Sequence, residues 1–166
     1  SFTPDDYVPI FQKLGVTLVI RLNKAAYDRK KFTNKGLKHL DLQFVDGTAP
    51  PDDIAERFMK EVEQEKGAVA IHCKAGLGRT GSLIALYAMK HYGFPAAPFI
   101  GWIRVARPGS ILGPQQNYLN QIESRYMAQG GNSKRGELTS FNSQSMTNQM
   151  GKMNIDAKQD MSTMNA

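Results

Sequence analysis

The stretch AVAIHCKAGLGRTGSLIALYAMKHYG, residues 68–93, contains the single cysteine of the chain. Its first six residues, AVAIHC, are mostly small and β-branched apolar residues and predict a buried strand. A strongly apolar helix is expected from Thr80 to about Tyr92. The loop Cys73–Arg79 therefore joins a strand to a helix N-terminus, where backbone N–H groups gather around a small volume. Such a volume suits an oxyanion, and phosphate fits best.

The composition of the loop supports a phosphate site. Gly76 and Gly78 allow the backbone to curl around a ligand without side-chain obstruction. A thiol at a helix N-terminus beside Arg79 is expected to ionise well below the usual thiol pKa of about 8.5. Cys73 would then attack phosphorus and hold a phosphoryl group covalently. The planar Arg79 fork can bind two equatorial oxygens, and Thr80 can donate a hydrogen bond to the sulfur.

Three other interpretations of the cysteine are open to comparison. Cys73 alone would most often be a small buried apolar residue, but its spacing from the glycines, Arg79 and Thr80 favours the phosphate interpretation. A Walker-type nucleotide loop fits poorly, since the lysine that precedes its Ser or Thr is missing. A thioredoxin-type site would need a second cysteine. The sequence thus favours a phosphate-binding nucleophile.

Around this stretch, strand and helix patterns alternate. Expected strands cover 16–22 and 37–44, in addition to 68–73. Expected helices run from Pro4 to near Gly15, over 27–35, from Asp52 to Gly67, over 96–107 and over 114–129. The alternation predicts an α/β domain with a mostly parallel central sheet flanked by helices.

Composition bounds the class of protein. The 166 residues support one domain with a sizeable core, residues 1–129, followed by a disordered tail at 130–166 rich in Asn, Gln, Ser and Met. A single cysteine fits a reducing compartment. The opening lacks a secretory signal, and no apolar run is long enough to span a membrane. The net charge of +6 concentrates in 24–38, a solvated face or an attraction for phosphates; no nucleic-acid recognition motif accompanies it.

A departing alkoxide or phenoxide needs a proton, which an aspartate on a loop can supply. The candidates are Asp46, Asp52 and Asp53, in VDGTAPPDD. Asp52 and Asp53 stand at a helix start, where a carboxylate ordinarily caps. Asp46 precedes Gly47 in an irregular segment and is favoured, with Asp53 as the second choice; a simple Asp-Gly turn is the alternative.

Further polar residues are expected around the loop. Gln115 and Gln116, in GPQQ, can orient a water molecule for the second chemical step or simply occupy a first helical turn. His72 is expected to hydrogen-bond around the loop and to tune the thiolate. Arg104 and Arg107 can anchor the loop or the RPGS turn, and Trp102 is expected in the core. No metal site is expected, because His39, His72 and His91 lack ligand spacing.

HCKAGLGRTG resembles the signature of cysteine-based protein tyrosine and dual-specificity phosphatases. FVDGTAPPD, HCKAGLGRTGSLIALYAMKHYGF, GWIRVARPGSILGPQQ and, more weakly, IRLNKAAYDRKKFTNKGLKHLDL are similar to the cell-division-cycle-fourteen family, over residues 1–129. The resemblance implies the cysteine-based phosphatase fold, an enzyme that hydrolyses phosphoric monoesters, and no cofactor. It also implies Asp46 as general acid and GPQQ as the water-positioning loop, with Gln115 and Gln116 not separable. The implied substrate-binding loop residues are Lys74, Ala75, Gly76, Leu77 and Gly78.

The same resemblance implies the biological setting. The family dephosphorylates phosphoserine before proline, the mark of cyclin-dependent kinases, during mitotic exit and cytokinesis. The expected partners are phosphoproteins, in the nucleus and cytoplasm, with the nucleolus, spindle or centrosome as further places. Family members carry a preceding noncatalytic domain, and the chain begins after that domain would end, so selectivity for proline is expected to weaken. The oligomeric state is left open.

Two alternatives remain at the level of sequence. Phosphoinositide phosphatases with a similar loop carry a second lysine where this chain has Leu77, so a protein phosphoester is favoured over an inositol phosphate. A phosphotyrosine or phosphoinositide phosphatase is nevertheless the first alternative. The second is a noncatalytic phosphoprotein-binding module, against which the presence of Cys73, Arg79 and Asp46 argues.

Overall fold

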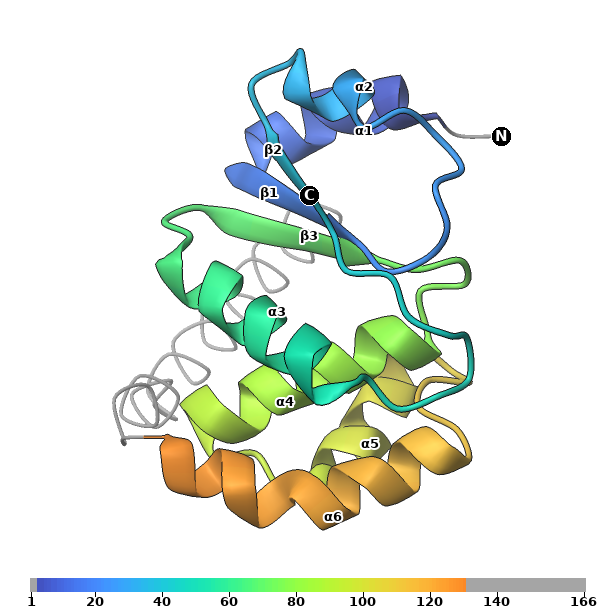
Figure 1. The fold of residues 1–166 in the computed structure, drawn as a ribbon, viewed down its shortest axis with the longest axis vertical. Coiled ribbons are helices and arrows are strands. Elements are labelled where there is room, and N and C mark those ends of the chain that lie inside the picture. Colours follow the sequence, from blue (N-terminus) through green and yellow to red (C-terminus); the bar gives the residue numbers. More distant parts are fainter. Residues whose placement is uncertain (1–2, 131–166) are drawn as a thin grey trace, which may run out of the picture.

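The structure, a computed structural model, describes residues 3–130 and has α/β architecture (Figure 1). Three parallel strands form one sheet in the order β2-β1-β3: β1 (Val16–Arg21), β2 (Lys38–Asp41) and β3 (Ala68–His72). The helices are α1 (Pro4–Lys13), α2 (Lys30–Thr33), α3 (Asp52–Gln64), α4 (Gly78–Tyr92), α5 (Ala96–Ala106) and α6 (Pro114–Gln129). The predicted α/β class with a parallel sheet is confirmed.

Helices cover both faces of the sheet (Figure 1). On one face α1 and α2 pack on β1 and β2, and the buried side chains of Val8, Val19 and Phe32 meet there. On the other face lie α3 to α6, around a larger core that includes Leu18 and Ile20 of β1. Successive residues of a strand point to opposite faces, so β1 supplies both cores.

The helix that follows the cysteine loop is the centre of the larger core. Leu83, Leu86 and Met89 of α4 are fully buried, as its apolar sequence predicts. The helix ends at Tyr92 and is capped by Gly93, which has a left-handed backbone (φ 59°) and donates its N–H to the Met89 carbonyl. It begins at Gly78, two residues before the predicted start, so the first turn already contains the arginine of the loop.

The strand register places one buried charge at the carboxyl edge of the sheet. Arg21 is the register partner of Asp41 on β2 and of His72 on β3. Because the strands are parallel, the loops that follow them leave at the same edge, where ligands bind in open α/β sheets. The loop that begins at Cys73 leaves from this edge.

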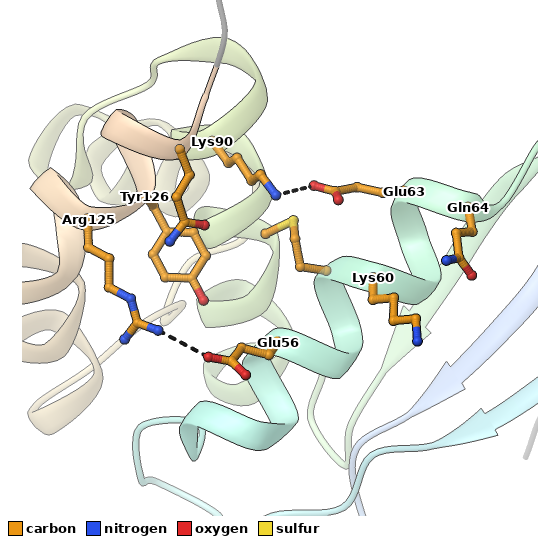
Figure 2. A pocket seen from close by; sticks show the side chains of 9 residues that line it. Glu56, Lys60, Glu63, Gln64, Lys90, Arg125 and Tyr126 are labelled. Atoms are coloured by element: carbon orange, nitrogen blue, oxygen red, sulfur yellow. Dashed lines mark hydrogen bonds and ion pairs between the residues drawn. The ribbon is translucent and has the colours of Figure 1, made fainter.

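Ion pairs fasten α3 to its neighbours on the far side from the sheet. Lys90 of α4 contacts Glu63 at 2.6 Å, and Arg125 of α6 contacts Glu56 at 3.2 Å, around a cavity of about 390 Å³ (Figure 2). Pairs that water reaches contribute little each, typically below about 1 kcal/mol. We therefore interpret this cavity as a gap where α3, α4 and α6 pack together, and not as a ligand site.

Several sequence expectations change in extent. The second strand ends at Asp41 rather than at residue 44, and α2 covers Lys30–Thr33 rather than 27–35. Trp102, expected in the core, is 58% exposed, so that prediction was wrong. The tail predicted at 130–166 lies outside the described residues, apart from Gly130. Within residues 3–130, no helix has the length and hydropathy needed to cross a bilayer.

Candidate active site

The loop between β3 and α4 curls around the cysteine sulfur. The Gly76 N–H donates to Cys73 Sγ at 3.1 Å. Gly76 has a φ of 70°, in the left-handed region that favours glycine. A Cβ at this position would also lie 2.8 Å from Arg107 Nη2. The predicted approach of the backbone to a central ligand volume therefore needs glycine here, and Arg107 packs against the loop as expected.

The Cys73 thiol is buried and its pKa is lowered from the ordinary value. Burial is the largest single influence and raises the pKa. Hydrogen bonds to sulfur from the Thr80 hydroxyl, the Thr80 N–H and the Gly76 N–H, together with the Arg79 charge, outweigh it. The geometry of the Thr80 hydroxyl falls short of a fully formed bond, since Oγ1 is buried without a partner among residues 3–130. Of these contacts, the Gly76 N–H to Sγ at 3.1 Å has the geometry of a fully formed hydrogen bond.

The Arg79 guanidinium is buried and partly engaged by the sheet edge. Its Nη1 donates to the carbonyls of Leu22, at 3.2 Å, and Phe44, at 3.1 Å. Nε lies 3.2 Å from Asp46 Oδ1, an ion pair without hydrogen-bond alignment. The Nε and Nη2 edge makes no hydrogen bond within the described part of the chain. That edge has the geometry to bind two oxygens of one phosphate.

Asp46 is the carboxylate that the structure brings to the loop. Its Oδ1 accepts a hydrogen bond from the Gly47 N–H at 3.1 Å, and its side chain is 71% exposed. Asp46 therefore both forms the Asp-Gly turn and remains the candidate for the general acid. Asp52 and Asp53 instead begin α3, and Asp52 lies 3.5 Å from Arg125. The role of Asp46 stays a prediction, but its position beside Arg79 distinguishes it from both neighbours.

The structure separates the two glutamines of GPQQ. Gln115 is 2% exposed, and its Nε2 donates to the Thr48 carbonyl at 3.1 Å. Its Oε1 packs against Gly78 so closely that a Cβ added to Gly78 would lie only 2.6 Å from this oxygen. Gln116 Oε1 accepts from Arg104 Nη2 at 2.9 Å. Gln115 thus contacts both the phosphate loop and the segment that carries Asp46, whereas Gln116 is held by α5.

Two cavities flank the loop and share Lys74. One, of about 780 Å³, is lined by Asp46, Arg79, Lys74 and the exposed Val45. The other, of about 680 Å³, is lined by Cys73 and by loop residues that include Ala75 and Gly76. The predicted acid and nucleophile therefore open to neighbouring cavities. Leu77 lines neither; its side chain packs toward the turn at Gly109.

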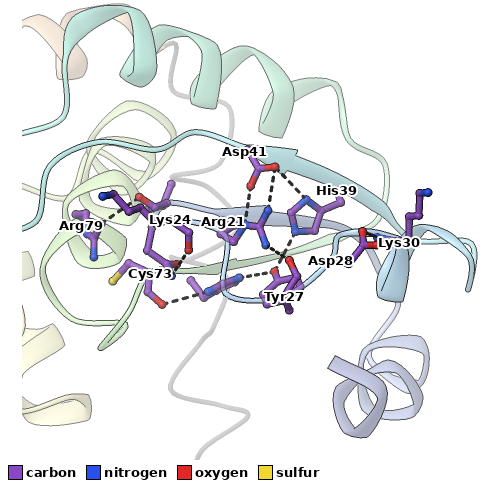
Figure 3. A network of polar contacts seen from close by, with 12 residues as sticks. Arg21, Lys24, Tyr27, Asp28, Lys30, His39, Asp41, Cys73 and Arg79 are labelled. Carbon is purple, nitrogen blue, oxygen red and sulfur yellow. Dashed lines mark hydrogen bonds and ion pairs between the residues drawn. The ribbon is translucent and has the colours of Figure 1, made fainter. Parts of the chain in front are cut away.

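A partly buried polar network begins behind the cysteine (Figure 3). His72 Nδ1 lies 3.1 Å from the Cys73 carbonyl oxygen, and His72 Nε2 lies 2.7 Å from the Tyr27 hydroxyl. That hydroxyl is also 2.9 Å from His39 Nε2. Burial lowers the pKa of both histidines. The predicted link from His72 to the loop is present, and a neutral imidazole at both positions fits the surroundings.

Sequence reasoning missed four members of this network, namely Arg21, Tyr27, His39 as a structural partner, and Asp41. A signal was available, since Arg21, His39, Asp41 and His72 lie on strands at positions that point to one face. Tyr27, in the segment before α2, carried no such signal.

Elsewhere, Arg104 anchors the turn as expected, donating to the carbonyls of Ser110 and Ile111. Among residues 3–130, no group of three or more His, Cys, Asp or Glu could hold a metal.

Comparison with known proteins agrees with this geometry. Residues 3–126 match the family described as dual specificity phosphatase, catalytic domain. Human dual specificity protein phosphatase CDC14A is 54% identical over 127 residues, which are 76% of this chain and 21% of that protein. Tyrosine-protein phosphatase CDC14 of Saccharomyces cerevisiae is 46% identical over 120 residues, 69% of this chain and 22% of that protein. The chain spans about a fifth of the length of these relatives.

The fold is also that of solved phosphatase structures. The crystal structure of PTPMT1 superposes with a TM-score of 0.67, at 21% identity, over 77% of this chain and 89% of that one. Tk-PTP in its active form gives a TM-score of 0.62, at 23% identity, over 73% and 86%. At this identity the likeness shows the fold alone, the cysteine-based phosphatase fold that the sequence predicts. By its matching family model, the chain belongs to the dual specificity phosphatase catalytic domain family, and its sequence is similar to those of the CDC14 phosphatases.

Proposed function

We propose that this chain hydrolyses phosphoserine, phosphothreonine and phosphotyrosine in proteins through a phosphocysteine intermediate. The observation that carries the proposal is the Gly76 N–H directed at Cys73 Sγ, 3.1 Å away, in a loop that lowers the pKa of the thiol. A purely structural buried cysteine would instead have its pKa raised by its apolar surroundings. Membership of the dual specificity phosphatase family supports the same reaction.

In the first step the Cys73 thiolate attacks phosphorus, forming the S–P bond as the P–O bond to the substrate breaks. The departing oxygen takes a proton from Asp46, which therefore enters the step protonated. Two non-bridging phosphate oxygens bind the Nε and Nη2 edge of Arg79, and the loop amides bind the third. The bond from Nη1 to the Leu22 and Phe44 carbonyls holds the arginine in place throughout.

In the second step water attacks the phosphocysteine and releases inorganic phosphate. Asp46, now a carboxylate, accepts the proton of the water. As the S–P bond breaks, Cys73 leaves as a thiolate, which is stabilised by the Thr80 hydroxyl and the loop amides. Gln115 orients the water, since it is the glutamine that contacts both the loop and the segment of Asp46. Lys74, which lines both cavities, attracts the phosphate dianion.

The substrates we propose are Ser-Pro sites of cyclin-dependent kinases, with a role in the cell cycle or cytokinesis. Similarity to CDC14 phosphatases over about three quarters of the chain supports this. We extend the proposal to residues 1–129 as the catalytic domain, and to action in the nucleus and cytoplasm, including the nucleolus, spindle or centrosome. Leu77, which packs away from both cavities, adds no charge for an inositol phosphate.

The test measures phosphate release from matched phosphoserine-proline, phosphothreonine and phosphotyrosine peptides and from a phosphoinositide. We expect the parent chain to release phosphate from the peptides and Cys73→Ser to release none. The melting temperature of Cys73→Ser is expected within about 2 °C of the parent. Cys73→Ser is expected to retain phosphopeptide binding, because Arg79 and the loop amides remain. Equal rates for the parent and Cys73→Ser would reject the enzyme proposal in favour of a binding module. Faster release from the phosphoinositide would overturn the protein substrate.

A further inference from the structure

The Tyr27 hydroxyl lies between the rings of two histidines, which stand on the two outer strands of the sheet. It is 2.7 Å from His72 Nε2 on β3 and 2.9 Å from His39 Nε2 on β2. The His39 side chain is fully buried. The other nitrogen of the His72 ring, Nδ1, faces the Cys73 carbonyl at 3.1 Å. An unbroken line of hydrogen-bonding atoms thus runs from His39 through Tyr27 and His72 to the backbone of the nucleophile.

The direction of each hydrogen bond in this line follows from its partners. A carbonyl oxygen only accepts, so His72 Nδ1 carries a proton and donates to Cys73. In a neutral ring the opposite nitrogen is then an acceptor, and the Tyr27 O–H donates to His72 Nε2. The Tyr27 oxygen in turn accepts from the N–H at His39 Nε2. All three bonds point toward Cys73, and bonds aligned in one direction polarise one another.

Tyr27 is held in place by more than its hydroxyl. Arg21 donates from Nη1 to the Tyr27 carbonyl at 2.7 Å, and its guanidinium carbon lies 4.5 Å from the centre of the Tyr27 ring. Arg21 is itself buried and paired with Asp41 at 2.7 Å. The ring of Phe32 meets the Tyr27 ring edge-on. These contacts hold the hydroxyl in one position. They involve the backbone and the ring, so they remain when Tyr27→Phe removes the hydroxyl.

We propose that Tyr27 is a positioning residue for the nucleophile: by fixing the His72 ring with its Nδ1–H on the Cys73 carbonyl, it holds the start of the phosphate loop. The proposal rests on the proposed function, since it concerns the same cysteine. A carbonyl held at the start of the loop keeps the following amides, such as that of Gly76, directed at sulfur. Loss of the Tyr27 hydroxyl frees the ring to rotate or to change tautomer, and the loop relaxes.

Other groups face this line and must stay constant in its test. Arg21 on β1 and Asp41 on β2 act electrostatically on both histidines, and Arg29, before α2, acts on His39. None of these is altered by Tyr27→Phe. Burial is the main cause that raises the pKa of the Tyr27 hydroxyl to about 12, so it keeps its proton at any pH where the enzyme is assayed. The hydroxyl is a fixed donor and not a titrating group.

The test is the pH dependence of alkylation of the chain by iodoacetamide, which reads the single cysteine directly. For Tyr27→Phe we expect the thiol pKa to rise by about half to one unit, the value of about one hydrogen bond. The acid limb of kcat/KM is expected to move with it. Long-range proton–nitrogen NMR correlation is expected to show His72 as the Nδ1–H tautomer in the parent and a mixture in Tyr27→Phe.

Matched variants separate positioning from mere packing. Tyr118→Phe removes another partly buried hydroxyl, one with no hydrogen-bond partner among residues 3–130, and is expected to leave the thiol pKa unchanged. His39→Leu removes the donor to Tyr27 and is expected to raise the thiol pKa, whereas His39→Gln keeps an N–H and is expected to shift it less.

Two results would overturn the proposal. One is a thiol pKa in Tyr27→Phe within about 0.2 unit of the parent, even if the melting temperature falls. The other is an unchanged His72 tautomer with an equal shift in Tyr118→Phe. Neither readout needs substrate turnover. A chain that proved inactive on phosphoesters would therefore reject the proposed function and leave the role of Tyr27 to be decided by alkylation and NMR.

Discussion

Arg79 Nε lies 3.2 Å from Asp46 Oδ1, which joins the arginine of the phosphate loop to the aspartate of the segment between β2 and α3. The arginine side chain is 6% exposed and the aspartate side chain 71%. The aspartate occupies the guanidinium edge that a phosphate would bind. Substrate and Asp46 therefore compete for Arg79, and we expect phosphate binding to free the Asp46 side chain to approach the leaving oxygen.

Replacing this carboxylate tests it as the general acid. Asp46→Asn is expected to slow phosphoserine hydrolysis by about 10²–10⁴-fold, because the alkoxide then leaves without a proton. An activated aryl phosphate, whose leaving group needs no proton, is expected to lose far less. Asp53→Asn is the matched control and is expected to retain the parent rate on both substrates. The assignment is wrong if Asp53→Asn shows the loss and Asp46→Asn does not.

Arg79→Lys tests whether shape or charge matters at the loop. The lysine keeps one positive charge. It loses the bidentate Nε and Nη2 edge of the guanidinium and the Nη1 hydrogen bonds to the Leu22 and Phe44 carbonyls. We expect kcat/KM to fall by about 10²–10³-fold. Lys74→Arg, which keeps the charge of a residue that lines both cavities, serves as comparison and is expected to stay within about threefold. A mild Arg79→Lys would indicate that charge alone suffices.

The loop could be predicted because its chemistry is local. Cys73, Gly76 and Arg79 are close in sequence, and the strand and helix around them each have a clear apolar pattern. The Arg79 contacts with the Leu22 and Phe44 carbonyls, and that of His72 with Tyr27, join distant segments. Nothing in a residue's own neighbourhood encodes such contacts. They follow only from the register of the parallel strands.

Two errors have a similar origin. Trp102 lies on α5, which is apolar nearly all round, so its sequence does not reveal that Phe99 and Ile103 face the core while Trp102 faces outward. The second strand was predicted too long because alternating burial continues through Leu42 and Phe44 after the regular strand has ended at Asp41. Burial pattern and strand pairing are different properties, and sequence reports the first.

The pH dependence of Cys73 reactivity follows from its lowered pKa. The reactive form is the thiolate, so the alkylation rate rises with pH through the thiol pKa. Because the loop amides, Thr80 and Arg79 outweigh burial, the midpoint is expected below the usual value of about 8.5. Stopped-time alkylation between pH 4 and 9, with mass-spectrometric quantification, measures it. A midpoint at or above 8.5 would show that burial dominates and that Cys73 is protonated at neutral pH.

Asp41 links sheet stability to pH. Burial raises the pKa of Asp41, but the Arg21 hydrogen bond and charge outweigh it, so its folded pKa lies below the unfolded value. A lowered carboxyl pKa stabilises the fold above the unfolded pKa of about 3.9, and this is lost as pH falls through the folded pKa. Asp41→Asn is expected to cost about 1–2 kcal/mol at pH 7, discounted because the carboxylate is partly exposed.

Urea unfolding at pH 7 and at pH 3 measures this contribution. The difference between parent and Asp41→Asn is expected to shrink at the lower pH. Asp5→Asn, which removes an exposed pair with Lys31, is the control and is expected to change the unfolding free energy by less than about 0.5 kcal/mol. Equal losses in the two variants would mean that the buried Arg21 gains nothing special from its partner.

The two glutamines of GPQQ are expected to differ because only Gln115 contacts the loop. Gln115→Ala removes the amide that lies against Gly78 and that donates to the Thr48 carbonyl. Hydrolysis of the phosphocysteine is expected to slow by about tenfold, roughly one hydrogen bond in the transition state. Its formation is expected to change less. Rapid-quench kinetics with an aryl phosphate would then show a burst of product followed by a slow steady state.

Gln116→Ala is the matched control, since the same amide is deleted one residue further along the helix. Gln116 accepts from Arg104, which also donates to the Ser110 and Ile111 carbonyls, so the loss of Gln116 leaves both bonds from Arg104 to the turn in place. We expect single-phase kinetics near the parent rate. A burst in Gln116→Ala without one in Gln115→Ala would reverse the assignment. Bursts of equal size in both would mean that the turn as a whole, rather than one amide, places the water.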